Sequence, residues 1–398
     1  MAKAAILGFG TVGSGVWEIF EKSDFTKKAG EKIEVAHILD IRDFSDHPKK
    51  ELFTKNFDDI LNDKEVGFAA ETMGGLHPAY EYTKALLERG VSVATSNKEL
   101  VATYGPELLK TAYDHGCRYL FEASVGGGIP IIRPLTSCLL ANTVERIAGI
   151  LNGTTNFILT DMIEHNTSFD AALSQAQELG YAERNPAADI EGHDACRKTA
   201  ILASMAWGDF VDYNDIHTEG ITKITSEDIS YAARFGKVIK LIGCAEKNAN
   251  GSICACVAPM LVDNSDPLSG VRDVFNAIAV RGDFLGDAMF YGRGAGKLAT
   301  ASAVCADVID MVKSPKPGAA PLLWATGGAR ISPEKEKERR FFVKTAAPQS
   351  KIEELFGEVE TAGGVKDGEI GFITPVMSLC ALEGKLAKIG GEYMRVLD

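Results

Sequence analysis

The sequence predicts an α/β protein that begins with a doubly wound parallel sheet and continues into further domains. Three observations support this: a glycine-rich turn between a short apolar strand and an amphipathic helix, strands that alternate with helices up to about residue 130, and a different pattern beyond it. With 398 residues the chain exceeds one ordinary core, and roughly 150 residues per domain suggests two or three domains.

The glycine-rich turn lies in residues 3–22, "KAAILGFGTVGSGVWEIFEK". Gly8 permits a tight turn, Gly10 allows close approach of a pyrophosphate, and Gly13 allows close packing of helix on strand. The next strand, "EKIEVAHILD", ends in an acidic residue, as in a Rossmann-type dinucleotide-binding domain. The predicted cofactor contacts of the turn are Gly8, Phe9, Gly10, Thr11, Val12 and Gly13.

The acidic residue at the end of the second strand is Asp40, which could accept a hydrogen bond from a ribose 2′-hydroxyl and so favours NAD. Arg42 follows two residues later and could instead meet a 2′-phosphate. Both NAD and NADP therefore remain open.

Further strand and helix patterns lead to "VSVATSNKEL". Ser96 and Glu99 have capping-box spacing, which predicts a helix beginning at Ser96 with Lys98 in its first turn. A cation there opposes the positive end of the helix dipole. A residue placed against local preference at the end of a strand suggests a functional lysine, and the alternative is a solvated one.

The middle third opens with "YLFEASVGGGIPII", in which three glycines follow a strand. They could expose backbone groups to a ligand. Together with Glu122 they could hold a hard cation through oxygen atoms, and a flexible turn is the alternative.

The segment "ERIAGILNGTTNFIL" predicts a strand, a polar turn, and a helix from about Phe157. Thr154, Thr155 and Asn156 offer hydroxyl, amide and backbone donors at the start of this helix. Such a start is a suitable seat for a carboxylate, although capping would explain one or two of the three residues.

The charged stretch "GYAERNPAADIEGHDACRK", residues 180–198, predicts a loop over 181–193 and then a helix. Asp194 and Lys198 lie four residues apart and share a helical face. A surface ion pair worth a few tenths of a kcal/mol is one interpretation. Because the helix continues as the apolar "TAILASMAW", we favour a domain boundary, where the pair could orient and polarise a carbonyl group.

Composition excludes other classes of protein. The net charge of −13 argues against nucleic acid or an anionic membrane as the main partner. No apolar run reaches the roughly 20 residues of a membrane span, and a strand begins at once, so we expect no cleaved leader and a cytoplasmic protein. The eight cysteines form no Cys-x-x-Cys pair and are interpreted as buried reduced thiols.

The motifs together resemble homoserine dehydrogenase. They are "GFGTVGSGV", "TSNKEL", "FEASVGGGIPII", "GILNGTTNFIL", "ELGYAERNPAADIEGHDACRK" and "GRGAGKLATASAVCADVIDM", and they span residues 4–312 in the order of that family. The resemblance implies NAD(P)-linked, reversible interconversion of L-homoserine and L-aspartate 4-semialdehyde, within threonine and methionine biosynthesis.

The resemblance also assigns residues. Lys98, Lys198 and Asp194 correspond to the catalytic residues of the family. The implied substrate-binding set is Glu183, which would meet the amino group, with Asp189, Lys198, Asn152, Gly153, Thr154 and Tyr181. Further cofactor contacts would be Thr72, Met73, Lys98 and Gly296. A structural monovalent cation, Na⁺ or K⁺, would bind Glu122, Val125, Gly127 and Ile129.

This resemblance gives expected boundaries. Residues 1–130, rejoined by 290–313, would form the dinucleotide-binding domain, and 131–289 an α+β mixed-sheet domain for substrate binding and dimerisation. Residues 314–338, with "KSPKPGAAP" and the charge run "SPEKEKERR", would be a linker. A homodimer or higher homo-oligomer is expected.

Residues 339–398 predict a βαββαβ unit that resembles a regulatory ACT domain. The glycine expected after its first strand is absent from "KTAAPQSK". Threonine as an effector at this unit is therefore a hypothesis.

Two alternatives belong to other classes. A semialdehyde dehydrogenase that acylates phosphate needs a nucleophilic cysteine beside a base, and no cysteine here lies in a suitable turn. A catalytically inactive nucleotide-binding regulator should have lost Lys98 or Lys198, and the sequence keeps both.

Overall fold

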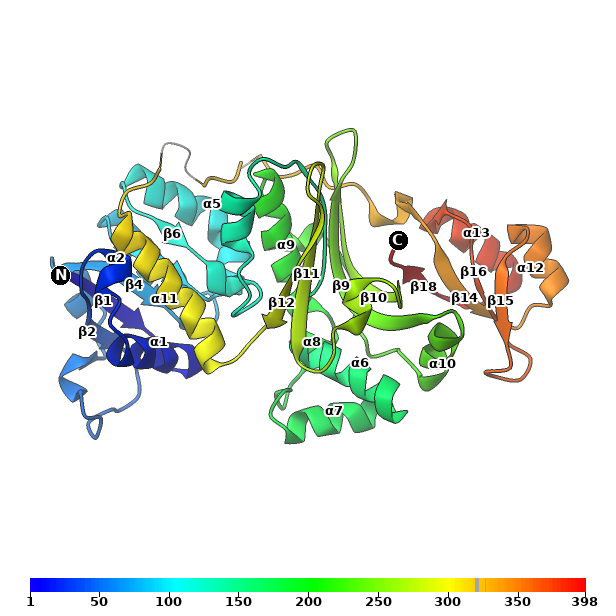
Figure 1. Cartoon of the computed structure of the whole chain (residues 1–398), viewed down its shortest axis with the longest axis horizontal. Coiled ribbons are helices and arrows are strands. Elements are labelled where there is room, and N and C mark those ends of the chain that lie inside the picture. Colours follow the sequence, from blue (N-terminus) through cyan, green and yellow to red (C-terminus); the bar gives the residue numbers. More distant parts are fainter. Residues whose placement is uncertain (319–321, 326) are drawn as a thin grey trace. The chain divides into compact units, whose positions relative to one another are not determined.

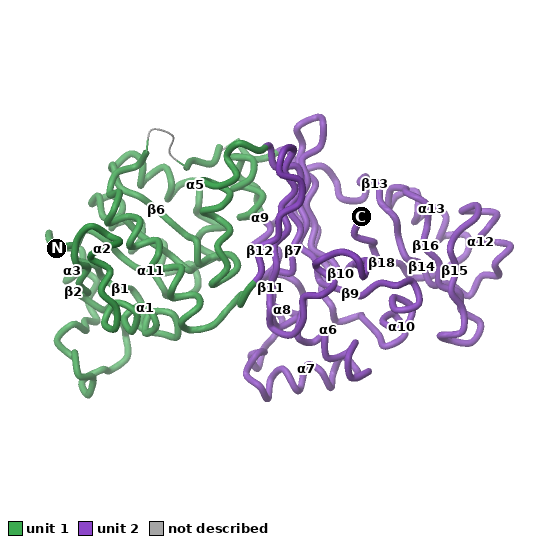
Figure 2. The backbone as a smooth tube through the Cα atoms, in the orientation of Figure 1, with its two compact units in different colours: residues 1–142, 200–212, 292–329 green, residues 143–199, 213–291, 330–398 purple. Residues whose placement is uncertain are grey.

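The computed structural model describes residues 1–318, 322–325 and 327–398. The chain forms two compact units (Figure 2). Unit 1 contains residues 1–142, 200–212 and 292–329, and unit 2 contains residues 143–199, 213–291 and 330–398. Residues 319–321 and 326 of the predicted linker lie outside the described residues.

Unit 1 contains a parallel sheet that has six strands among its described residues (Figure 1). The strand order is β3-β2-β1-β4-β5-β6, the doubly wound order of dinucleotide-binding domains. The apolar runs predicted as strands form its centre, because strands buried on both faces read as continuous apolar segments. The bounds are β1 (Ala2–Leu7), β2 (Ile33–Leu39), β3 (Phe53–Thr54), β4 (Val66–Glu71), β5 (Ser92–Thr95) and β6 (Tyr119–Leu120).

The helices of unit 1 follow the predicted alternation with the strands. Helix α11 returns from the far end of the sequence and packs on α1, where Gly15 leaves no room for a side chain: a Cβ would lie 2.8 Å from the carbonyl oxygen of Lys297. The bounds are α1 (Thr11–Lys22), α2 (Thr26–Ala29), α3 (Asp58–Leu61), α4 (Ala79–Glu88), α5 (Lys98–Asp114) and α11 (Lys297–Lys313).

The expected start of α5 was wrong by two residues. Asn97 is the cap residue, and its side chain accepts a hydrogen bond from the Leu100 amide. Asn97 also donates to the carbonyl oxygen of Gly75. This long-range contact selects Asn97 over Ser96, which has an equally suitable side chain.

Unit 2 contains a mixed sheet in the order β12-β11-β7-β9-β10-β18-β14-β16-β15, with β8 paired to β10. Its central strands β9 and β10 are buried along nearly their whole length, and alternate residues such as Cys256, Ala258 and Met260 belong to one apolar core cluster. The bounds are β7 (Val144–Ile150), β8 (His217–Thr218), β9 (Lys237–Lys247), β10 (Ile253–Asp263), β11 (Phe275–Gly282) and β12 (Gly286–Arg293).

Two predicted boundaries in unit 2 were wrong. Helix α6 begins at Gly153, not near Phe157, because the Asn152 side chain caps it by accepting from the Thr155 amide. The stretch 181–193 is not all loop, since Pro186 precedes a single helical turn. The helices are α6 (Gly153–His165), α7 (Phe169–Glu178), α8 (Ala187–Ile190), α10 (Ser226–Arg234) and α9 (His193–Trp207), whose residues from 200 onward belong to unit 1.

The last residues of the chain have the predicted strand–helix order (Figure 1). Strand β18 pairs in parallel with β10, so this segment extends the sheet of unit 2. Its apolar core includes Phe341, Ile352 and Phe372. The bounds are β13 (Glu338–Arg339), β14 (Phe341–Thr345), α12 (Gln349–Phe356), β15 (Glu360–Gly363), β16 (Ile370–Ile373), β17 (Met377–Ser378), α13 (Leu379–Ile389) and β18 (Glu392–Val396).

Two further observations concern the cysteines and the apolar character of the helices. The eight cysteines, all in described residues, are free thiols, and Cys138 and Cys380 are exposed rather than buried. Of the helices in the described ranges, none combines the length and apolar character needed to span a membrane.

Candidate active site

The glycine turn of unit 1 has a different requirement at each glycine. Gly8 has φ +88°, which favours glycine, and a Cβ on Gly13 would lie 1.9 Å from the Gly8 carbonyl oxygen. A Cβ on Gly10 would meet nothing within 4 Å. Gly10 therefore borders open space at the start of α1, whose cap provides no side chain to its amides. An uncapped helix start beside open space fits an anionic group such as a pyrophosphate.

The other residues of the turn divide between core and surface. Phe9 is buried, with its ring 4.9 Å from that of Phe53, and its amide donates to Asp40. Val12 packs against the core and Thr11 is exposed. Phe9 and Val12 thus serve the fold through their side chains, and any cofactor contact there would use backbone atoms or Thr11.

Asp40 is engaged with its neighbour Arg42. Asp40 receives the Phe9 amide at 2.8 Å, and both of its oxygens accept from the Arg42 guanidinium, at 3.0 and 2.9 Å. The Arg42 side chain, with hydrogen bonding as the largest cause, lowers the pKa of Asp40 to about 2. Arg42 itself is exposed and lies over the Phe44 ring. Asp40 thus holds the exposed Arg42 guanidinium just beyond the carboxyl end of β2.

The carboxyl ends of β4 and β5 carry three predicted cofactor contacts. Thr72 follows β4, and its hydroxyl donates to the Gly8 carbonyl oxygen at 2.8 Å. Met73 donates its amide to the buried carboxyl of Glu71. Lys98 is the first residue of α5. These residues follow adjacent parallel strands, where ligands of such sheets bind.

Gly296, the late glycine of the prediction, is the cap residue of α11 in unit 1. Its φ of +128° favours glycine, and no side chain caps the helix. Like the start of α1, the start of α11 therefore leaves its first amides without a side-chain partner.

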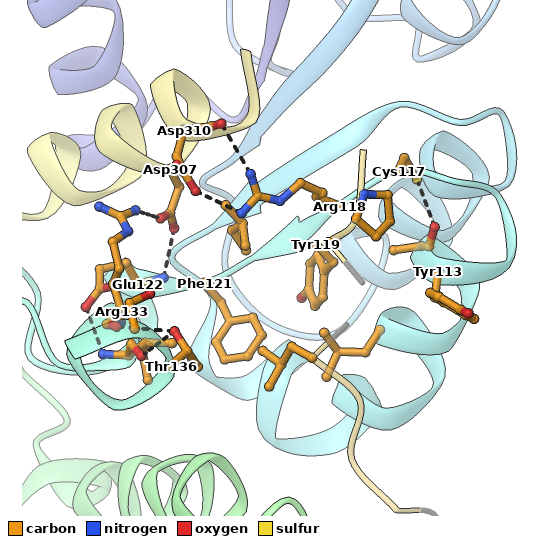
Figure 3. Close-up of a pocket in the computed structure, with 18 residues that line it drawn as sticks. Tyr113, Cys117, Arg118, Tyr119, Phe121, Glu122, Arg133, Thr136, Asp307 and Asp310 are labelled. Atoms are coloured by element: carbon orange, nitrogen blue, oxygen red, sulfur yellow. Dashed lines mark hydrogen bonds and ion pairs between the residues drawn. The ribbon is translucent and has the colours of Figure 1, made fainter. Parts of the chain in front are cut away.

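Glu122, the acidic residue of the predicted cation-binding set, is buried (Figure 3). The oxygen Oε1 of Glu122 accepts the amides of Ile131 and Ile132, and Oε2 accepts the amide of Arg133. Asp307 accepts the Glu122 amide and pairs with Arg133. Glu122 therefore caps the segment that follows it, a role that the sequence did not reveal.

The glycines after Glu122 also have a structural role. Gly127 has φ +55°, and a Cβ there would lie 2.3 Å from the Gly294 carbonyl oxygen. Val125 and Ile129 are buried. Within the described part of the chain, no group of three or more His, Cys, Asp or Glu side chains could hold a metal ion. A cation here would depend on backbone carbonyl oxygens.

Unit 2 brings together the predicted lysine and both predicted aspartates. Lys198 is 9% exposed, and its ammonium donates to Asp194 at 2.7 Å and to the Leu151 carbonyl oxygen at 2.8 Å. The Asn152 amide nitrogen donates to Asp194 at 2.8 Å and to Asp189 at 2.7 Å. This is a buried charge network rather than a surface ion pair.

The remaining substrate-binding predictions lie on the loop before α8 and at the start of α6. Thr154 donates its hydroxyl to the Tyr181 carbonyl oxygen at 2.7 Å, which ties the two segments together. Tyr181 is partly exposed with its ring against Phe157. Glu183 is exposed. The side chains of Thr155 and Asn156 are buried and hydrogen-bonded within the protein, so they are not free donors for a carboxylate.

Two polar residues, one in each unit, were not assigned a role from the sequence. Glu71 is fully buried at the end of β4, and an acidic residue closing the apolar run "VGFAA" is the signal that could have identified it. Arg197, in the charged stretch 180–198, lies over the Tyr213 ring, with its guanidinium carbon 5.3 Å from the ring centroid.

Two of the buried cysteines lack the chemistry that the acylating alternative needs. Burial raises the pKa of Cys254 to about 11 and that of Cys305 to about 12, so both are protonated thiols at neutral pH. Neither is a ready nucleophile.

Known proteins match both units. The model of the homoserine dehydrogenase family matches residues 130–309, and the model of the homoserine dehydrogenase NAD-binding domain matches residues 8–122. A homoserine dehydrogenase of Synechocystis is 41% identical over 357 residues, 86% of this chain and 82% of the relative. The chain belongs to the homoserine dehydrogenase family.

Solved homoserine dehydrogenases agree with this. The enzyme from Thiobacillus denitrificans has a TM-score of 0.90 at 33% identity, and the match covers 99% of this chain and 97% of that one. A hyperthermophilic archaeal homoserine dehydrogenase in complex with NADPH has a TM-score of 0.68 at 28% identity, covering 79% of this chain and 99% of that one. The protein is thus an NAD(P)-dependent oxidoreductase that interconverts L-homoserine and L-aspartate 4-semialdehyde.

Proposed function

We propose that Lys198 is the group that stabilises and protonates the carbonyl oxygen of the aldehyde during homoserine dehydrogenase turnover. The single observation that carries this proposal is the buried ammonium, fixed at 2.7 Å from Asp194 and 2.8 Å from the Leu151 carbonyl oxygen. An oxygen that gains alkoxide character needs a positive field and a proton, and an ammonium supplies both.

Asp194, Asp189 and Asn152 orient this lysine in the proposal. One Asn152 amide group joins the two carboxylates, so all three side chains are fixed relative to Lys198. Fixed groups cost little reorganisation when charge develops on the substrate. Asp194 acts directly on the ammonium, while Asn152 acts through the aspartates.

The α-amino and α-carboxylate groups of the substrate require further partners. We propose Glu183 and Asp189 for the amino group, Gly153 and Thr154 at the start of α6 for the carboxylate, and Tyr181 as a wall of the site. A helix start attracts a carboxylate through its amides and its dipole. The bond between Thr154 and the Tyr181 carbonyl oxygen supports the assignment, because it links the two segments that would bind one molecule.

The nicotinamide nucleotide supplies the hydride when it is bound. We propose that the glycine turn from Gly8 to Gly13 and Gly296 hold its phosphates, that Thr72, Met73 and Lys98 contact the nicotinamide end, and that Asp40 and Arg42 read the ribose. The open space beside Gly10 supports the phosphate assignment. Because Arg42 is fixed by Asp40 with its guanidinium exposed, we propose a preference for NADP over NAD.

We further propose a structural Na⁺ or K⁺ at Glu122 with the backbone carbonyl groups of Val125, Gly127 and Ile129. The oxygen Oε2 of Glu122 accepts one amide and so keeps capacity for a second partner. If the cation binds, K⁺ or Na⁺ will raise the melting temperature relative to choline at equal ionic strength, and Glu122→Gln will remove the difference. An equal melting temperature in all three salts contradicts the site.

The assembly and regulation of the protein are also proposals. We propose a homodimer through the sheet of unit 2, because the edge strand β12 exposes Met289 and Tyr291. We propose that residues 339–398 form an ACT-like regulatory unit that responds to threonine, on the basis of the antiparallel order β18-β14-β16-β15. Threonine that changes neither activity nor oligomeric state would contradict this.

Eight free thiols support a reducing, cytoplasmic location.

The decisive experiment is oxidation of NADPH with L-aspartate 4-semialdehyde by wild type and Lys198→Ala. We expect the variant to bind NADPH normally and to lose on the order of 10²-fold or more in kcat. Turnover near that of wild type would refute the role of Lys198. Lys98→Ala should weaken nucleotide binding as well as turnover.

A further inference from the structure

Three neighbouring strands of unit 1, β1, β4 and β5, end side by side, and Glu71 is the last residue of the middle strand. The proposed function gives Glu71 no role. Glu71 pairs with Leu7 of β1 on one side and with Thr95 of β5 on the other. All three residues immediately precede segments assigned to the nucleotide. The side chain of Glu71 is 0% exposed, which is rare for a glutamate.

The Glu71 carboxyl joins two of these segments. Its Oε1 accepts the Met73 amide at 2.7 Å, and its Oε2 accepts the Thr95 hydroxyl at 2.5 Å. The Thr95 oxygen in turn accepts the Asn97 amide at 2.9 Å. One carboxyl therefore links the backbone of the turn after β4 to the backbone that leads into Lys98.

The same segments are joined at two further points. Asn97 donates its side-chain amide to the Gly75 carbonyl oxygen at 2.7 Å, and Thr72 donates its hydroxyl to the Gly8 carbonyl oxygen at 2.8 Å. Three turns from three strands are thus connected by side chains that do not themselves face solvent. Glu71 lies at the centre of this set.

We propose that Glu71 is a positioning residue for the nicotinamide nucleotide, because its carboxyl and Thr95 hold the turns at Met73 and at Asn97–Lys98 in one fixed geometry. The inference rests on the proposed cofactor role of these turns. Glu71 would act through the backbone, because it does not contact the ligand itself. Without its hydrogen bonds the two turns are held less firmly, so the nucleotide binds less tightly and Lys98 is positioned less accurately.

The proposal depends on hydrogen bonding and not on a charge at Glu71. Burial, the largest cause, raises the pKa of Glu71 to about 7, so a neutral form is accessible near neutral pH. A neutral carboxylic acid can still accept from the Met73 amide and can donate to the Thr95 oxygen. Glutamine offers the same acceptor and a donor at the same positions, so it is the conservative replacement.

The test compares Glu71→Leu, Glu71→Gln, Thr95→Val and Thr83→Val by equilibrium NADPH fluorescence titration without substrate, and by kinetics. Thr83 is the matched control, because it is buried in α4 of the same unit and its hydroxyl has no hydrogen-bond partner among the described residues. We expect Glu71→Leu to raise the dissociation constant of NADPH at least tenfold, Thr95→Val to raise it several-fold, and Glu71→Gln and Thr83→Val to stay within threefold of wild type.

The kinetics separate positioning from a general loss of folded protein. For Thr95→Val and Glu71→Leu we expect a higher KM for NADPH and a lower kcat, with the KM for the aldehyde within twofold of wild type. If Glu71→Leu does not fold, Thr95→Val against Thr83→Val decides. Equal NADPH affinity in those two variants overturns the proposal, and so does a Glu71→Leu protein that folds and binds NADPH as wild type does.

Failure of the proposed function would look different. NADPH binding without substrate does not require Lys198, so the titration remains informative even if Lys198→Ala turns over normally. Wild-type protein that binds neither NADPH nor NADH would instead contradict the nucleotide assignment of unit 1 itself.

Discussion

The proposed nucleotide site and the proposed substrate site use different kinds of chemical group. In unit 1 the assigned contacts are chiefly backbone groups at the ends of strands and helices, shaped by glycines such as Gly8 and Gly296. In unit 2 they are chiefly charged side chains: Lys198 pairs with Asp194, and the Asn152 amide joins Asp194 to Asp189. A backbone site is fixed by the fold, whereas a charged site depends on each partner being present.

This difference predicts opposite responses to small changes. Adding one methyl group at a close-packed glycine of the turn in unit 1 should damage nucleotide binding and should leave the charge network of unit 2 unchanged. Replacing one oxygen by nitrogen should damage the charge network of unit 2 while its fold persists. The predictions below separate these cases.

The largest expected effect concerns Gly13→Ala. The new Cβ would lie 1.9 Å from the Gly8 carbonyl oxygen and 2.7 Å from the Thr72 hydroxyl, so the turn must move. We expect a loss of about 3 kcal/mol in the free energy of unfolding and no measurable nucleotide binding. Gly10→Ala is the matched variant: its Cβ meets nothing, so we expect a cost of at most about 1 kcal/mol and NADPH binding at least about tenfold weaker.

Denaturant unfolding and NADPH titration measure both variants. A Gly10→Ala protein that binds NADPH as wild type does shows that the phosphates do not lie against Gly10. A Gly13→Ala protein of unchanged stability shows that the turn has more freedom than its contacts indicate.

The next effect concerns the charge network of unit 2. Asp194→Asn keeps the shape of the side chain but removes the carboxylate that lies 2.7 Å from the Lys198 ammonium. We expect kcat to fall on the order of 10²-fold while the dissociation constant of NADPH stays within about twofold. Asp170→Asn, an exposed change on α7 of the same unit, is the control and should leave kcat unchanged. A fall in kcat of less than about threefold for Asp194→Asn would refute the network.

The sequence could predict the backbone site more completely than the charged one, for a physical reason. Glycine adopts positive φ and lacks a Cβ, which no other residue combines. The spacing of the glycines in residues 8–13 therefore predicts the conformation and close packing of the turn. The pair Asp194 and Lys198 could also be predicted, because both lie on one helical turn. The contacts of Asn152 with Asp189 and Asp194 could not, since these partners are 37 and 42 residues away and no local pattern specifies them.

The errors have the same origin. Ser96 and Asn97 are equally good cap residues by local preference, and the contact of Asn97 with Gly75, 22 residues earlier, decides between them. The cap that Glu122 provides could not be predicted for the same reason, because the amides that its oxygens accept lie nine to eleven residues later. Glu71 belongs to no motif, and its role depends on the register of three strands.

Glu71 also gives a pH dependence specific to unit 1. Its pKa is raised from 4.5 to about 7 by burial, so the folded state retains a proton that the unfolded state has lost. The stability from this group is complete below about pH 4.5 and disappears as the pH rises through 7, a change of about 3 kcal/mol. Glu71→Gln cannot titrate. Denaturation at pH 5 and pH 8 should therefore show wild type losing stability relative to Glu71→Gln. A constant difference between the two proteins contradicts the raised pKa.

The smallest expected effect concerns the choice of nucleotide. Arg42 lies at the end of β2 with its guanidinium held by both oxygens of Asp40, so its positive charge is fixed but exposed. Arg42→Ala removes that charge and frees Asp40 to accept a ribose hydroxyl. We expect the ratio of KM for NADPH to KM for NADH to rise about tenfold, about 1.4 kcal/mol.

Lys27→Ala removes one exposed charge from the same unit and controls for net charge. Because an exposed charge is screened by salt, the effect of Arg42→Ala should shrink at high ionic strength. An unchanged ratio of the two KM values would mean that Arg42 does not contact the ribose and that Asp40 does. The main structural role of Asp40 would then be to accept the Phe9 amide and so hold the glycine turn.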